Sequence, residues 1–125
     1  MLPRTGFDRH YVATCRESVG AAVEELRRVE AGSVAWNQLA VALEHWFAQR
    51  IPKVEGRDGN PLNEVRAIAD SVIEHGAVLA VPKGTKLRSE TSVLGFEPGE
   101  EIALDGDAFE RLFDAFLAEI EERYC

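Results

Sequence analysis

A chain of 125 residues with a formal net charge of −8 at pH 7 is the size of one globular domain, 1–125, and is long enough to bury a core without a metal or a disulfide framework. The acidic charge makes nucleic acid and anionic membranes unfavourable partners. The chain has two cysteines, no N-terminal apolar run before a small-residue cleavage site, and no apolar segment near ~18 residues. We therefore expect a small, soluble, cytoplasmic protein without a membrane span.

Two helices are predicted after a loose lead-in at residues 1–7. From about Asp8 to Glu30, apolar residues recur at helical spacing. Gly32 is typical of a helix end, and a second helix is predicted from about Val34 to Gln49. Both tryptophans and Phe47 lie on its apolar face, where such side chains usually belong to the core. The short loop predicts that the two helices pack antiparallel.

The most clearly specified helix begins at Asn60 and Pro61, after a connection over residues 50–60. Asn60 suits the N-cap, because its side-chain oxygen can accept an N–H of the first turn. Pro61 suits the first helical position, because its missing N–H is not needed there. The apolar face continues to His75, and the glycine that follows is typical of a helix end. We therefore predict a helix from Pro61 to about His75.

The apolar period changes after residue 76. Residues 77–81 form a short apolar run, and residues 82–84 suit a tight turn into residues 85–88. This pattern predicts a β-hairpin. Residues 102–104 alternate as a strand does.

The last helix is predicted after Asp105, which suits an N-cap, and its apolar face runs from Phe109 to Tyr124. We expect this face to belong to the core. The predicted fold class is therefore α+β, predominantly helical, with four helices and a small β-hairpin or sheet between the third and fourth helices.

No catalytic or metal-binding motif stands out in the sequence. The pairs Glu44-His45 and Glu74-His75 cannot chelate as units, because adjacent helical residues point about 100° apart. Cys15 falls on an apolar helical stripe, where we expect a reduced, buried thiol without a partnered histidine. We predict no catalytic residue, no metal and no cofactor.

The candidate binding site is the loop and helix start around Asn60. A helix N-terminus offers free N–H groups and a partial positive charge, so an anion could bind there with help from a nearby cation. The alternative is that Asn60 satisfies those N–H groups itself and the charged neighbours pair with one another. The candidate residues are Lys53, Arg57, Asp58, Asn60, Asn63, Glu64 and Arg66.

A second cationic group, Lys83, Lys86 and Arg88, lies on the predicted hairpin. No aromatic residue is interleaved with it, as a single-strand stacking platform requires. We interpret it as a solvated face of the hairpin or as a group that protects an edge strand.

Two function hypotheses follow. The first is a non-catalytic interaction or accessory protein, whose partner is another protein or a second copy of the chain. Its support is the lack of a catalytic constellation, the acidic composition, and two Trp, six Phe and two Tyr residues. The second is an anion or small-molecule binding domain, with an enzyme as one form of it, centred on residues 53–66. An open pocket with unpaired side chains there favours the second; mutual pairing, with an exposed apolar patch elsewhere, favours the first.

Overall fold

The computed structural model describes residues 4–125, which form five helices joined by loops and contain no β-strand. The helices are α1 (Arg9–Arg28), α2 (Ser33–Trp46), α3 (Pro52–Glu55), α4 (Pro61–Glu74) and α5 (Gly106–Tyr124). Within this range, two isolated backbone bridges join Arg4 to Arg50 and Val78 to Glu101. The domain is therefore all-helical, and the α+β class expected from the sequence is wrong.

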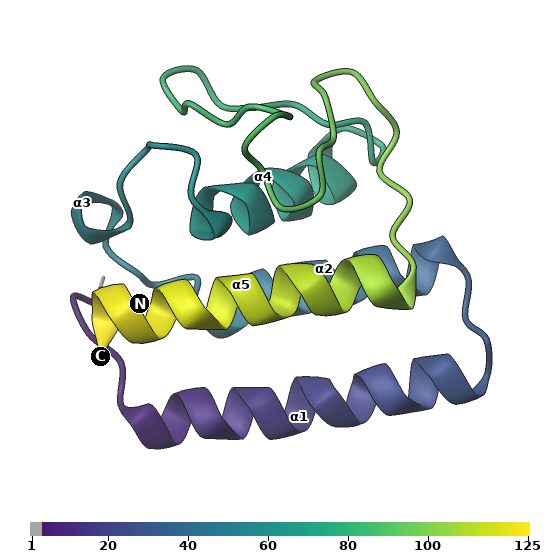
Figure 1. The fold of residues 1–125 in the computed structure, drawn as a ribbon, viewed down its shortest axis with the longest axis horizontal. Helices are drawn as coiled ribbons and strands as arrows, with labels where there is room; N and C mark the ends of the chain where they lie inside the picture. Colours follow the sequence, from purple (N-terminus) through teal and green to yellow (C-terminus); the bar gives the residue numbers. More distant parts are fainter. Residues whose placement is uncertain (1–3) are drawn as a thin grey trace.

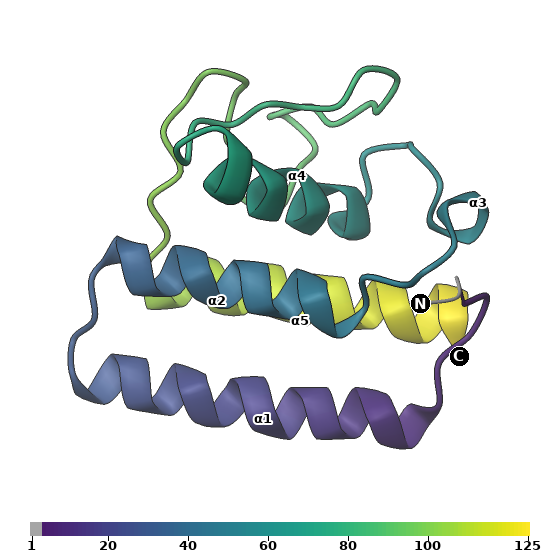
Figure 2. The same ribbon diagram turned by 180° about the vertical axis from the view of Figure 1, so that it is seen from behind.

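The helices are arranged in three layers. α2 and α5 lie side by side in the middle layer, with α1 on one side and α4 on the other (Figure 1). The view from behind shows the same order, with α2 now in front of α5 (Figure 2). The long coil between α4 and α5 passes over the outer side of α4. Short α3 packs beside α5, near the C-terminus.

Aromatic side chains fill the core where α1, α2 and α5 meet. The rings of Phe7 and Phe47 meet edge-on with their centroids 4.9 Å apart, and the centroid of Phe47 is 5.7 Å from that of Phe116. Such aromatic pairs add to the free energy gained by burying the rings. The apolar face predicted for the last helix is buried as expected, from Phe109 to Tyr124.

The expected loose lead-in, residues 1–7, lies partly outside the described residues, which begin at Arg4. The backbone N–H of Arg4 donates to the carbonyl of Gln49 at 2.6 Å, and its carbonyl accepts from Ile51 at 2.9 Å. Phe7 is buried, and its N–H donates to the carbonyl of Tyr124 at 2.9 Å. Residues 4–7 thus connect the ends of α2 and α5.

The connection predicted over residues 50–60 contains helix α3, so the described residues hold five helices instead of four. Pro52 stands at its first position, where the missing N–H costs nothing. The helix ends after one turn at Gly56, whose φ of 75° favours glycine. This single turn is too short to show a helical apolar period in the sequence.

The β-hairpin predicted over residues 77–88 is absent from the described chain because its two halves bond to different partners. The N–H of Leu79 donates to the carbonyl of Glu100 at 2.9 Å, whereas the N–H of Lys86 donates to the carbonyl of Arg57, also at 2.9 Å. The hydroxyl of Ser71, on α4, accepts from the N–H of Ala80 at 2.9 Å. Each half is therefore hydrogen-bonded to a different segment of the chain, and no β-ladder forms between the two halves.

The strand-like alternation at residues 102–104 predicts burial correctly but not a sheet. Ile102 and Leu104 are buried and Ala103 is exposed. The side-chain amide of Asn37, on α2, donates to the carbonyl of Ile102 at 2.8 Å and accepts from the N–H of Leu104 at 3.1 Å. A single asparagine thus takes the place of a neighbouring strand.

Glu64 ties the coil to α4. Its carboxylate accepts from the N–H groups of Val93 at 2.8 Å and Leu94 at 3.0 Å, and the residue is only 3% exposed. Hydrogen bonds to an ionised group are stronger than those between neutral groups. This buried carboxylate fixes a turn of coil that lies 29 and 30 residues further along the chain.

Replacing Glu64 with Ala should therefore release residues 93 and 94. We expect a loss of about 1.5–3 kcal/mol in the free energy of unfolding, the usual contribution of hydrogen bonds to a charged group. The measurement is chemical denaturation together with amide hydrogen exchange at Val93 and Leu94, which should become faster. Glu74→Ala, an exposed change in the same helix, is the control. Unchanged exchange at both amides would contradict the role of Glu64.

Candidate functional site

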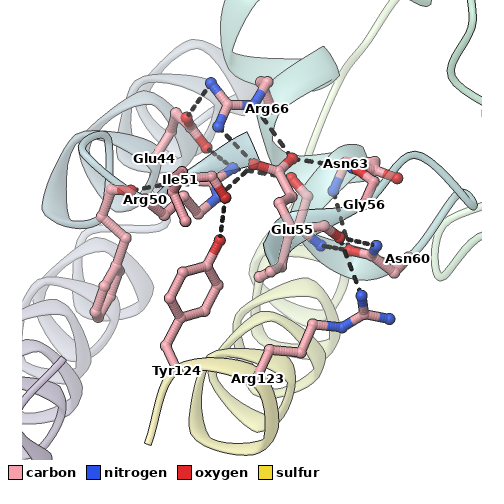
Figure 3. Close-up of polar contacts among 12 residues, drawn as sticks. Glu44, Arg50, Ile51, Glu55, Gly56, Asn60, Asn63, Arg66, Arg123 and Tyr124 are labelled. Carbon is pink, nitrogen blue, oxygen red and sulfur yellow. Dashed lines mark hydrogen bonds and ion pairs between the residues drawn. The ribbon is translucent and has the colours of Figure 1, made fainter. Parts of the chain in front are cut away.

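A buried arginine joins the ends of three helices below the candidate site. The side chain of Arg50 is fully buried. Its Nε donates to Glu55 at 2.9 Å, and one terminal nitrogen donates to Glu44 at 2.9 Å and to the carbonyl of Leu62 at 3.1 Å (Figure 3). The other terminal nitrogen donates to the carbonyl of Phe47 at 3.1 Å. Arg50 therefore connects the C-terminal end of α2, helix α3 and the first turn of α4.

A second arginine completes this network. Arg66, on α4, donates to the two carboxylate oxygens of Glu55 at 2.6 and 3.2 Å, and it lies 3.6 Å from Glu44. Two carboxylates thus meet two guanidinium groups, and their formal charges cancel. We refer to Glu44, Arg50, Glu55 and Arg66 as the ion-pair network.

The two carboxylates of the network have opposite pKa shifts. Burial raises the pKa of Glu44, although Arg50 beside it acts in the other direction. Burial also acts to raise the pKa of Glu55, but hydrogen bonds from Arg66 and the charge of Arg50 outweigh it, so that pKa is lowered. Glu55 is therefore the more firmly ionised of the two.

The first turn of α4 is capped by its own residues. The side-chain oxygen of Asn60 accepts from the N–H groups of Leu62 at 2.8 Å and Asn63 at 3.3 Å. Its amide nitrogen donates to the carbonyl of Glu55 at 2.8 Å. The cap predicted for Asn60 is confirmed. Because Asn60 already occupies these N–H groups, they do not offer an open anion site.

Asn63 is also fully engaged. Its amide nitrogen donates to the carboxylate of Glu55 at 2.9 Å and to the carbonyl of Gly56 at 3.0 Å, and its oxygen accepts from the N–H of Gly59 at 2.9 Å. On the other side of the loop, Arg123 donates to the carbonyl of Glu55 at 3.0 Å. The loop between α3 and α4 is thus held from several directions.

An open cleft of about 250 Å³ lies beside this loop. One wall comes from α3, the loop after it and α4, and the other from the turn at residues 82–85. The lining residues are Pro52, Glu55, Gly56, Arg57, Asn63, Arg66, Pro82, Lys83 and Thr85.

The two walls are held together at Gly59. A Cβ atom there would overlap the carbonyl oxygen of Lys86, and the φ of Gly59 is +88°, so the close approach requires glycine. The hydrogen bond from Lys86 to the carbonyl of Arg57 joins the same segments. Arg57 itself lies against the turn, with a guanidinium nitrogen 3.6 Å from the place a Cβ of Gly84 would take. The backbone thus brings Arg57 and Lys83 to one cleft.

The residues predicted from the sequence to form the binding site fall into three groups in the structure. Arg57, Asn63 and Arg66 line the cleft, although Asn63 and Arg66 are bonded within the protein. Asn60 and Asp58 stabilise the loop: the amide of Asn60 donates to Asp58 at 2.6 Å, and this bond lowers the pKa of that carboxyl. Two predicted residues lie away from the cleft lining, namely Glu64, which holds the coil, and Lys53, which is exposed on α3.

Sequence reasoning missed Glu44, Arg50 and Glu55 because nothing in their spacing distinguishes them from surface charges. Lys83 was recognised only as one of three neighbouring cations. Its relation to Arg57 depends on the path of the coil, which a hairpin would have changed. The sequence signal that could have drawn attention to it is the local excess of cations at residues 50–57 and 83–88 in an acidic chain.

Three further features were considered from the sequence: a metal site, a reactive cysteine and a membrane-spanning helix. No group of three or more His, Cys, Asp or Glu side chains in residues 4–125 could hold a metal ion. Burial raises the pKa of Cys15 to about 12, so this thiol stays protonated and is a poor nucleophile. No helix within the same range is long and apolar enough to cross a membrane.

Comparison of the chain with protein-family models, with curated proteins and with solved structures gives no match.

Asn60→Ala should cost about 0.5–2 kcal/mol of unfolding free energy, because it leaves N–H groups of the first turn without their cap. Asn60→Asp should retain much of this stability, because a carboxylate also caps the helix and complements its dipole. Denaturant unfolding of the three proteins measures the difference. Equal stability of the parent and Asn60→Ala would contradict the structural role.

The opposite shifts in the ion-pair network predict opposite pH effects. The lowered pKa of Glu55 contributes stability above the unfolded value of 4.5, and this stability is lost as pH falls through the folded pKa. The raised pKa of Glu44 contributes stability below the unfolded value, and that stability is lost as pH rises through the folded pKa.

Unfolding curves from about pH 3 to pH 7 should therefore separate Glu55→Gln from Glu44→Gln. Relative to the parent, Glu55→Gln should lose less stability on acidification, and Glu44→Gln should lose less as the pH rises. At neutral pH, Glu55→Gln should cost about 3–5 kcal/mol, because Arg50 and Arg66 must then share Glu44 as their one remaining carboxylate in the network, which leaves one positive charge without compensation. The same sign of pH effect in both variants would contradict the assignment.

Proposed function

We propose that this chain is a non-catalytic binding protein that holds a small anionic ligand in the cleft lined by Arg57 and Lys83. The main observation in support of this proposal is that two cations from separate segments line one open cleft in a chain of net charge −8. In this proposal the protein works in the cytoplasm, where its two cysteines, both free thiols, stay reduced.

The charge balance of the cleft supports an anion. The ion-pair network contains two carboxylates and two guanidinium groups, so it neutralises itself. Among residues 4–125, no carboxylate lies within ion-pair distance of Arg57 or Lys83. Their two positive charges remain at the cleft, where an anion would gain charge-assisted hydrogen bonds.

The fixed position of the walls also supports binding. The cleft does not depend on long mobile segments, because Asn60, Asn63 and Arg123 brace the loop and the Lys86–Arg57 backbone bond braces the turn. A site that is formed before its ligand arrives spends less binding free energy on ordering itself.

A second candidate function is protein interaction through an apolar surface. The large hydrophobic side chains that are most exposed in the described chain are Val29, Val34, Ile73 and Val78. They lie directly after α1, at the start of α2, at the end of α4 and in the residues after α4, and these segments lie at one end of the bundle (Figure 1). Another protein or a second copy of the chain would be the partner. Analytical ultracentrifugation over a range of protein concentrations tests self-association.

The main proposal predicts ligand-induced stabilisation that depends on both cations. A ligand at about ten times its Kd stabilises a protein by about 1.4 kcal/mol, which raises the Tm of a domain this size on the order of 5 °C. Thermal unfolding with phosphate, sulfate and small carboxylates should show such a shift for the parent. Arg57→Ala and Lys83→Ala should each remove most of it.

The matched control is Arg88→Ala, which removes an exposed cation of the same coil outside the cleft lining. This variant should keep the stabilisation. Equal loss in all three variants would reveal a non-specific charge effect, and no saturable shift in the parent would refute the proposal.

A further inference from the structure

We propose that the ligand of this cleft carries a dianionic phosphate monoester on a small molecule, with the phosphate held between Arg57 and Lys83. This inference rests on the proposed function and specifies its ligand class. It is based on the charge that remains at the cleft, the two kinds of cation, and the size of the space.

The remaining charge at the cleft matches a dianion. Of the charged residues that line it, Arg66 and Glu55 already pair with each other. Arg57 and Lys83 therefore contribute the two positive charges that a ligand would meet. A carboxylate monoanion would neutralise only one of them, whereas the dianionic form of a phosphate monoester neutralises both.

Glu55 does not oppose an anion in the way that a solvated carboxylate would. One of its oxygens accepts from Arg50 at 2.9 Å and Arg66 at 2.6 Å, and the other accepts from Asn63 at 2.9 Å. Its negative charge is thus directed toward partners within the protein. Its lowered pKa also keeps it ionised near neutral pH, so its charge does not change with the ligand's protonation.

The two cations suit a tetrahedral group with several oxygens. The guanidinium of Arg57 can donate two parallel hydrogen bonds to one pair of oxygens, while the ammonium of Lys83 acts as a compact charge from the other wall. Thr85 also lines the cleft, and a threonine hydroxyl is a donor that a remaining oxygen could accept from.

The size of the cleft favours a small ligand. Its volume of about 250 Å³ is below the roughly 300–1,000 Å³ that is common for drug-sized ligands and cofactors. Pro52 and Pro82 provide apolar contacts for a short carbon body. A phosphorylated metabolite of a few carbon atoms fits these limits better than a dinucleotide.

The test compares methyl phosphate with methyl sulfate by calorimetric titration of the whole protein. Methyl phosphate loses its second proton near pH 6, whereas methyl sulfate stays a monoanion. Between about pH 5 and pH 7.5 the dianionic fraction rises roughly tenfold, so the affinity for methyl phosphate should rise by a similar factor. The affinity for methyl sulfate should stay constant, which controls for titration of the protein itself.

Two single-residue variants test whether methyl phosphate binds in the proposed cleft. Lys83→Met should weaken methyl phosphate binding at pH 7.5 by on the order of tenfold, the equivalent of one charge-assisted hydrogen bond, and should reduce its pH dependence. Arg88→Met should change neither quantity. Circular dichroism and thermal unfolding of each variant establish that it is folded.

The outcomes separate the two proposals. If methyl sulfate binds as tightly as methyl phosphate at pH 7.5 and both depend on Arg57, the cleft binds anions but the dianion inference is wrong. If neither ligand nor a carboxylate binds, the proposed function fails as well. A phosphoserine peptide that binds more tightly than free phosphoserine would assign the site to a protein partner and overturn the small-molecule inference.

Discussion

The guanidinium group of Arg50 is the interaction on which the arrangement of this domain depends. It is fully buried, and its hydrogen bonds reach Glu44 on α2, Glu55 on α3 and the first turn of α4. Its carbon atom also lies 5.5 Å from the centre of the Phe116 ring on α5. A buried charge without partners costs several kcal/mol, so these groups cannot separate independently. Because α3 has only four residues, its position depends on this network and on Arg123, whose bond to Glu55 comes from α5. The wall of the cleft is therefore set by the core beneath it.

The coil between α4 and α5 shows how a long segment can be ordered without a sheet. Buried backbone groups need partners, and in a sheet these come from a neighbouring strand. Here side chains of the helices supply many of them: Asn37 bonds to residues 102 and 104, Ser71 to residue 80, and Glu64 to residues 93 and 94. The coil can thus follow the outer side of α4 without forming a ladder. This path also brings Lys83 to the cleft.

Local signals were sufficient for the four longer helices and insufficient for α3 and the coil. The cap at Asn60 and the buried face of α5 are properties of short sequence windows, and both were predicted. The alternation at residues 102–104 correctly marked Ile102 and Leu104 as buried. It does not specify whether a neighbouring strand or an asparagine side chain will form the hydrogen bonds to their backbone groups. The partners of residues 77–88 lie in the α3–α4 loop, on α4 and near residue 100, so a local pattern could not identify them. For the same reason, the predicted site included Arg57 and Arg66 but missed Lys83, Arg50 and Glu55.

The pairing within the candidate site divides its residues between structure and binding. Asn60, Asn63 and Arg66 were candidates for ligand contact, yet their hydrogen bonds are made within the protein. Breaking those bonds to hold an anion would leave Glu55 or the helix end without partners, at a cost comparable to the gain from the new contacts. Arg57 and Lys83 carry no such penalty, because their charges have no carboxylate partner among residues 4–125. The same network that removes Arg66 from ligand binding neutralises Glu55, which would otherwise repel an anion. Structural pairing at the helix start and the proposed anion binding beside it are therefore compatible, because the pairing neutralises Glu55 next to the cleft.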